Sequence, residues 1–123
     1  MKVLVVDDHD IVRRGIKQTL ADAYDNLTIA EADNADSALS LAVSDDWDVI
    51  ILDIYMPNKS GLELLKSLRE SVPKIPVLIL TTHAEELYAV RAFKAGAVGY
   101  LTKESAGEHL VRAVQKVPAA ANT

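Results

Sequence analysis

Acidic, hydroxyl and amine side chains directly follow several short apolar runs of this sequence, and together they could perform phosphoryl chemistry. These residues are Asp7 and Asp8 after residues 3–6, Asp53 after residues 49–52, Thr81 and Thr82 after residues 77–80, and Lys103 just beyond residues 98–101. If the runs are parallel strands, their carboxyl ends meet at one edge of a sheet, where open α/β sheets bind ligands. Three neighbouring carboxylates repel one another and need a cation. Oxygen ligands of this kind suit Mg²⁺.

A carboxylate at such a site can also act as a nucleophile and carry a phosphoryl group as an aspartyl phosphate. Mg²⁺ would neutralise the phosphoryl oxygens, Lys103 would supply a second positive contact, and the Thr81 hydroxyl could donate a hydrogen bond. The structural alternative is that aspartates often cap helices or occupy turns, so Asp8 could merely cap the first helix. Asp53 fits that alternative poorly, because it lies between a wholly apolar run and Ile54-Tyr55-Met56-Pro57.

Continuous runs rich in Val and Ile, at residues 3–6, 49–52 and 77–80, predict strands buried on both faces of a parallel sheet. Weaker strand signals lie at residues 27–32 and 98–101. The segments between them have apolar residues at helical spacing, including Val90 with Phe93, for which we expect a core position. The order is strand–helix repeated five times, which predicts an α/β fold with a parallel sheet and helices on both faces.

Length and composition limit the classes of protein. The 123 residues are enough for one domain, and the chain has no cysteine, which excludes disulfides, thiolate zinc sites and a catalytic cysteine. The first residues do not resemble a signal peptide, and there is no apolar stretch of about 20 residues, so we expect a cytoplasmic protein without a signal peptide or a membrane segment. Residues 118–123 are predicted to be a linker or a disordered tail after a domain at residues 1–117.

The charge is unevenly distributed. Residues 1–60 hold 5 basic and 12 acidic side chains, for a net −7, whereas residues 61–123 hold 8 and 6, for a net +2. A chain with an overall charge of −5 lacks the basic face of a nucleic-acid binder, so we expect no direct nucleic-acid contact.

Four motifs give the chain a family resemblance. They are Val5-Val6-Asp7-Asp8, Asp53-x-x-Met56-Pro57-x-x-x-Gly61, Leu80-Thr81 and Gly99-Tyr100-Leu101-x-Lys103. From Lys2 to Val117 the sequence resembles a response-regulator receiver domain of two-component signalling. It is most similar to the NarL/FixJ subfamily, whose members carry a LuxR-type output domain. The resemblance implies a flavodoxin-like, doubly wound sheet of five parallel strands in the order 2-1-3-4-5, with five helices.

The resemblance also implies roles for individual residues. Asp53 would be the phosphoacceptor, taking a phosphoryl group from the phosphohistidine of a sensor histidine kinase. Asp8 would bind Mg²⁺ directly, Asp7 largely through water, and the Tyr55 backbone carbonyl and Asp53 would complete the protein ligands.

The same resemblance describes the response. Lys103 would contact the phosphoryl group, Thr81 would move toward it, and Tyr100 would rotate inward behind it. The face formed by the fourth helix, the fifth strand and the fifth helix would then change shape and control an output domain or partner.

Two positions depart from many receivers. Glu104 follows Lys103 where proline, often after a cis peptide bond, is common, and a cis bond before a non-proline residue costs about 2.5–4 kcal/mol. Thr82 stands where a small residue is common, and its larger side chain should slow the attack of water on the phosphoryl group.

The expected function is a signalling switch, with at most self-phosphorylation and autodephosphorylation as activity, that regulates transcription through a DNA-binding domain outside this chain. The sequence is compatible with a homodimer, through the first and fifth helices or through the fourth-helix face. One alternative is a Mg²⁺-dependent phosphohydrolase, although Tyr55 stands where that class usually has a second aspartate. The others are an interaction module that works without phosphorylation and a flavodoxin-like carrier, whose FMN phosphate Asp7 and Asp8 would repel.

Other charged residues are expected to be solvated. His9 and His83 are predicted as exposed polar positions near the site, and the basic residues Arg13, Arg14 and Lys17 as a solvated helix face that could also meet a kinase.

Overall fold

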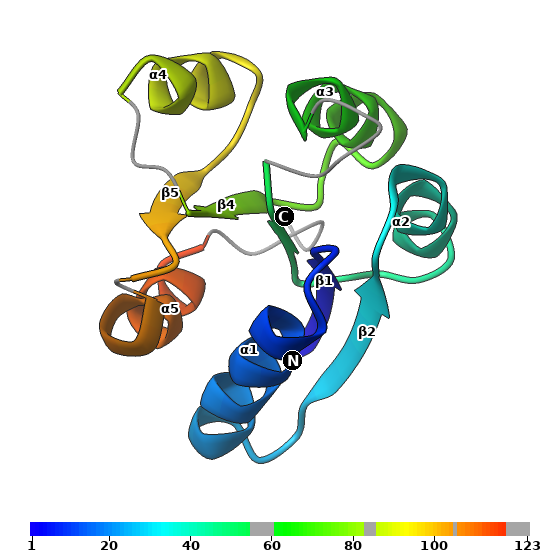
Figure 1. Cartoon of the computed structure of the whole chain (residues 1–123). Helices are drawn as coiled ribbons and strands as arrows, with labels where there is room; N and C mark the ends of the chain where they lie inside the picture. Colours follow the sequence, from blue (N-terminus) through cyan, green and yellow to red (C-terminus); the bar gives the residue numbers. More distant parts are fainter. Residues whose placement is uncertain (55–60, 83–85, 105, 118–123) are drawn as a thin grey trace.

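A parallel five-stranded sheet forms the centre of the computed structural model, which describes residues 1–54, 61–82, 86–104 and 106–117 (Figure 1). The strands are β1 (Lys2–Val6), β2 (Thr28–Ala32), β3 (Val49–Leu52), β4 (Val77–Thr81) and β5 (Gly99–Thr102). Their spatial order is β2-β1-β3-β4-β5, and every neighbouring pair is parallel. The predicted doubly wound α/β fold and its strand order are therefore confirmed.

Helices cover both faces of this sheet. They are α1 (Asp10–Ala23), α2 (Ala35–Ala42), α3 (Gly61–Ser71), α4 (Glu86–Lys94) and α5 (Ala106–Gln115). Figure 1 shows α1 and α5 together on one face and α2, α3 and α4 on the other. None of the helices in the described part of the chain is both long enough and apolar enough to span a membrane.

Alternate residues of the central strands enter two separate cores, which explains why these strands have no polar side. In β1, Leu4 and Val6 pack with the α2–α4 side, while Val3 and Val5 pack with the α1–α5 side. All four side chains are fully buried. A strand between two helical layers needs an apolar residue at every position, as the continuous runs predicted.

The expected core position of Phe93 is wrong. Its side chain is 50% exposed, and Val90 is 43% exposed. The small Ala92 is the fully buried residue of this stretch of α4, so the helix packs closely through Ala92 and leaves its larger apolar residues at the surface. Periodicity identified the helix but did not predict which side of it faces the core.

The structure tests two local predictions, the end of the fifth strand and the geometry of the peptide bond after Lys103. The fifth strand ends at Thr102, one residue later than predicted, because it pairs with β4 through Thr81 opposite Thr102. Among the described residues no peptide bond is cis, so the bond between Lys103 and Glu104 is trans. The predicted tail at residues 118–123 lies outside the described residues, as does His83.

Candidate functional site

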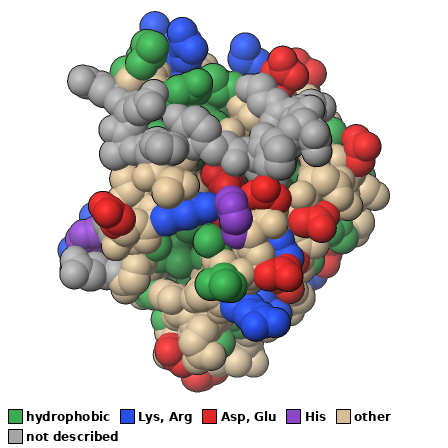
Figure 2. Space-filling view, in the orientation of Figure 1, with side chains coloured by type: hydrophobic (Ala, Val, Ile, Leu, Met, Phe, Trp, Pro, Cys, Tyr) green, Lys and Arg blue, Asp and Glu red, His purple; other side chains and the backbone are tan. Residues whose placement is uncertain are grey.

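Backbone pairing at the carboxyl ends of β1, β3 and β4 brings the predicted site residues together. Asp53 N–H donates to the Val6 carbonyl at 2.9 Å, and Lys103 N–H donates to the Thr81 carbonyl at 2.7 Å. Asp7 and Asp53 are each only 2% exposed, and Thr81 is fully buried. Acidic, basic and histidine side chains meet near the centre of this face in the space-filling view (Figure 2). The convergence expected from the sequence is present in the fold.

Lys103 is the cation of this cluster. Its Nζ lies 3.1 Å from Asp7 Oδ2 and 3.3 Å from Asp53 Oδ2, and its side chain is 16% exposed. Two buried carboxylates need a positive partner because water cannot solvate them. Lys103 therefore bridges the ends of β1 and β3 from its position just after β5.

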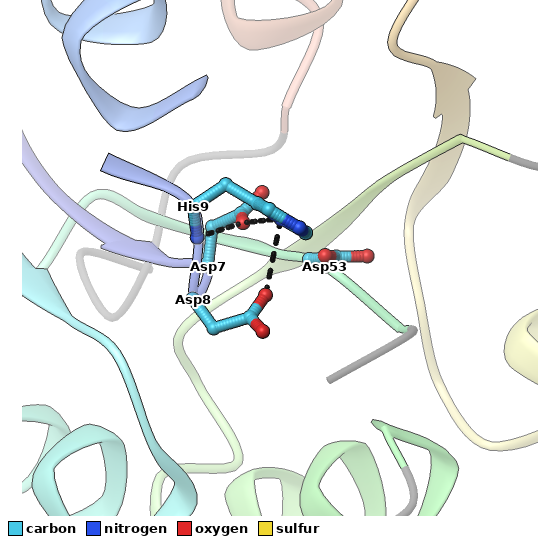
Figure 3. A group of neighbouring side chains, drawn as sticks. All are labelled: Asp7, Asp8, His9 and Asp53. Atoms are coloured by element: carbon cyan, nitrogen blue, oxygen red, sulfur yellow. Dashed lines mark hydrogen bonds and ion pairs between the residues drawn. The ribbon is translucent and has the colours of Figure 1, made fainter. Parts of the chain in front are cut away.

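His9 is exposed and near the site, as predicted, and it also contacts the acidic residues directly. Its Nδ1 lies 2.9 Å from Asp7 Oδ1 and 3.1 Å from Asp8 Oδ1, although 58% of the side chain is exposed. Figure 3 shows the ring lying against both carboxylates, with Asp53 beside it. The backbone N–H of His9 also donates to Asp7 Oδ1 at 2.8 Å. The only signal in the sequence was that His9 directly follows the two aspartates.

The alternative role of Asp8 as a helix cap is wrong. The residue before α1 is His9, and no side chain caps the helix there. Asp8 Oδ1 is instead a buried oxygen for which the described structure provides no hydrogen bond of acceptable geometry. Its carboxylate contributes to the cluster rather than to the helix start.

The hydroxyl of Thr81 is also buried without a hydrogen-bond partner among the described residues. Buried polar atoms are normally paired, and an unpaired hydroxyl costs about 1–3 kcal/mol. The Thr81 hydroxyl and Asp8 Oδ1, which has an ion-pair contact with His9 but no hydrogen bond among the described residues, both lie at this edge of the sheet. This site therefore has unused capacity for an additional polar or charged group.

The donor set fits a divalent cation. One ligand atom from each of Asp7, Asp8, His9 and Asp53 lies within 4.8 Å of the others. Carboxylate oxygens are the ligands that Mg²⁺ favours, together with water. The fourth expected ligand, the Tyr55 carbonyl, lies outside the described residues.

The predicted basic face of α1 is largely neutralised. Arg13 donates to the Asp7 carbonyl and pairs with Asp10 and Glu31, and Lys17 pairs with Glu31 at 3.2 Å. Burial alone would raise the pKa of Glu31, but hydrogen bonds from Lys17 and Arg13 outweigh it and lower this pKa. Arg13 thus supports the loop that carries Asp7.

Tyr100, the expected inward-rotating residue, lies in β5 opposite Ile79 of β4. It is half-buried and packs partly against the core on the α2–α4 side. Tyr100 therefore lies on the strand next to Thr81, two residues before the strand end.

Comparison with known proteins identifies relatives that match nearly the whole chain. The family model of the response regulator receiver domain matches residues 3–115. The response regulator GacA of Pseudomonas aeruginosa is 41% identical over 117 residues, which cover 95% of this chain and 55% of GacA. The nitrate/nitrite response regulator NarL of Escherichia coli is 40% identical over 119 residues, covering 95% and 54%. This chain thus spans about half the length of these relatives.

A solved structure agrees with the sequence matches. It is a response regulator from Burkholderia pseudomallei with a phosphorylated aspartic acid, a calcium ion and citrate. It superposes with a TM-score of 0.84 at 32% identity, over 94% of this chain and 66% of that one.

Proposed function

Because this chain belongs to the response regulator receiver family, we propose that it is a phosphorylation-controlled switch whose phosphoacceptor is Asp53. The donor is the phosphohistidine of a sensor histidine kinase, and the reaction depends on Mg²⁺. The observation that carries this proposal is the setting of Asp53, which is buried at a strand end, in contact with Lys103 and clustered with the carboxylates of Asp7 and Asp8. The related Burkholderia protein, which contains a phosphorylated aspartic acid and a cation, supports it.

In the transfer step, an oxygen of the Asp53 carboxylate forms a bond to phosphorus as the bond from phosphorus to the kinase imidazole breaks. The imidazole keeps the electron pair of that bond. Asp7, Asp8, Asp53 and the Tyr55 carbonyl would hold the cation, which when bound would supply positive charge to the phosphoryl oxygens. Lys103 supplies the second positive charge, since its Nζ already lies 3.3 Å from Asp53 Oδ2.

The phosphoryl group then gives the buried Thr81 hydroxyl an acceptor that it lacks in the described structure. Movement of Thr81 toward that oxygen leaves room for Tyr100 to rotate inward from β5. A ligand shifts such an equilibrium only through contacts that differ between the two states, and the new Thr81 hydrogen bond is one of these.

The output surface that we propose is formed by α4, β5 and α5. Leu87, Val90, Phe93 and Val98 are large apolar side chains that are at least 41% exposed on α4 and just before β5. Such a surface can bind an output domain, a partner or a second copy of the chain. Because the similar proteins DegU of Brevibacillus brevis and YdfI of Bacillus subtilis are transcriptional regulatory proteins, we infer that the regulated process is transcription. A cytoplasmic location remains a prediction from the sequence.

The test is labelling by a small phosphodonor in the presence of Mg²⁺, followed by intact-mass measurement and phosphate-affinity electrophoresis. Wild type should gain one phosphoryl group, Asp53→Asn none, and Asp46→Asn, which removes an exposed carboxylate near the other end of β3, the same amount as wild type. Undiminished labelling of Asp53→Asn would refute the assignment. Trp47 fluorescence is a poor reporter here, because this 4% exposed residue precedes β3 whereas Asp53 follows it.

Repeated turnover of a substrate would distinguish the phosphohydrolase alternative from the proposed switch. Sustained hydrolysis of a phosphate ester would support it, whereas a single labelling event supports the switch. Failure of any labelling in wild type would favour an interaction module that works without phosphorylation.

A further inference from the structure

The position of the His9 imidazole has a consequence for the choice of cation at the acidic site. Its Nδ1 lies 2.9 Å from Asp7 Oδ1 and 3.1 Å from Asp8 Oδ1. When metal–ligand bonds are about 2.1 Å long, ligand atoms at right angles to each other lie about 3.0 Å apart. The separations from the nitrogen to the two oxygens therefore match two edges of an octahedral coordination shell.

The backbone holds this arrangement in place. The His9 N–H donates to Asp7 Oδ1 at 2.8 Å, which fixes the turn between β1 and α1. The other oxygen of Asp7 is occupied by Lys103 at 3.1 Å, so Oδ1 and Oδ2 of the same carboxylate face different positive groups. The side of Asp7 that faces His9 is thus available to a cation without displacing Lys103.

We propose that His9 Nδ1 is a direct ligand at this site and that it makes the site select Ni²⁺ over Mg²⁺. This inference rests on the proposed function, because it uses the same carboxylates. A cation bound at Nδ1 takes the neutral imidazole, whose remaining hydrogen lies on Nε2. In a ring that is 58% exposed, that hydrogen can point to solvent.

The chemistry of the ligands gives the direction of the preference. Imidazole suits Ni²⁺, whereas Mg²⁺ favours oxygen and keeps several of its waters. A Mg²⁺ ion therefore gains little from His9. Nickel gains a nitrogen ligand that the carboxylates alone do not provide.

Isothermal titration calorimetry with tag-free, metal-stripped full chain tests this directly, using Mg²⁺ and Ni²⁺ as probes. His9→Ala removes the nitrogen, and His9→Asn replaces the ring by an amide that donates a hydrogen bond to the carboxylates but lacks the imidazole lone pair. His109→Ala, on the exposed surface of α5 and outside the acidic cluster, is the matched control.

We expect wild type to bind Ni²⁺ more tightly than Mg²⁺. Both His9 variants should lose at least about tenfold in Ni²⁺ affinity, since even outer-shell partners are worth about 10–100-fold. Their Mg²⁺ affinity should change by less than about threefold, and His109→Ala should match wild type with both ions. Circular dichroism of each variant checks that the fold is retained.

Three results would overturn the inference. The first is an unchanged Ni²⁺ affinity in His9→Ala, and the second is a Ni²⁺ affinity in His9→Asn equal to that of wild type. The third is an equal loss of Ni²⁺ and Mg²⁺ affinity in both variants, which would make His9 a positioning residue. In all three cases wild type still binds Mg²⁺ and the proposed function stands. If wild type bound neither ion, the proposed cation site itself would fail.

Discussion

Replacing Lys103 by methionine should destabilise the metal-free protein strongly, although the new side chain is apolar and similar in length. Lys103 Nζ lies 3.1 Å from Asp7 Oδ2 and 3.3 Å from Asp53 Oδ2. At an effective dielectric constant of about 20, each attraction is about 5 kcal/mol before solvation costs. Removing one partner of a buried ion pair typically costs about 3–5 kcal/mol, because the remaining charge has no solvent.

We expect the lower end of that range, about 3 kcal/mol, because 16% of the Lys103 side chain is exposed and water can enter when it is removed. With a urea dependence of about 1.5–2 kcal/mol per molar, the midpoint of unfolding should fall by about 1.5–2 M. The assay is urea unfolding followed by circular dichroism in the presence of a chelator. Lys66→Met, at an exposed position of α3, is the control and should change stability by less than about 0.5 kcal/mol.

A double-mutant cycle with Asp53→Asn tests the physical cause. If repulsion between unneutralised carboxylates destabilises Lys103→Met, removing the Asp53 charge should recover about 1–2 kcal/mol of the loss. Added Mg²⁺ should stabilise Lys103→Met more than wild type, because the ion replaces the missing positive charge. A Lys103→Met protein as stable as Lys66→Met, or effects of Lys103→Met and Asp53→Asn that are simply additive, would refute this reasoning.

The remaining predictions concern three other positions. Thr82→Ala should shorten the lifetime of the aspartyl phosphate, measured as decay of the labelled protein after the donor is removed; equal lifetimes would contradict it. Thr81→Val should stabilise the unphosphorylated protein by about 1 kcal/mol in urea unfolding, because it removes a buried unpaired hydroxyl, and a loss of stability would exclude this cause. Lys17 and Arg13 lower the pKa of Glu31 below its usual 4.5, so the stabilisation is complete above pH 4.5 and is lost as pH falls through the lowered folded-state pKa. Glu31→Gln should therefore show a smaller loss of stability on acidification than wild type, and identical acid unfolding curves would count against it.

Much of the fold could be predicted from local patterns. The strands at residues 3–6 and 49–52 were predicted within one residue, because a strand covered on both faces must be apolar at every position. Convergence of Asp7, Asp53 and Thr81 followed from the same pattern, since parallel strands end at one edge.

Contacts between side chains from different elements were not predictable in this way. The engagement of Arg13 with Glu31 depends on how α1 lies over β2, and the exposure of Phe93 depends on which side of α4 reaches the core. An apolar stripe usually predicts which side of a helix faces the core. In α4 the buried side is instead the one that carries the small Ala92, while Val90 and Phe93 are exposed.

The sequence by itself determined the α/β class of this protein and the residues that stand at its strand ends, because both depend on the alternation of strand and helix along the chain. Only the tertiary structure decided how those residues meet. It placed Lys103 between Asp7 and Asp53, brought the His9 ring against two carboxylates, and gave the Thr81 hydroxyl no partner among the described residues. The Lys103 contacts depend on residues far apart in the chain, whose distances are set when the strands pair and the helices pack. The His9 contacts join neighbours in the chain and depend on the conformation of the turn between β1 and α1.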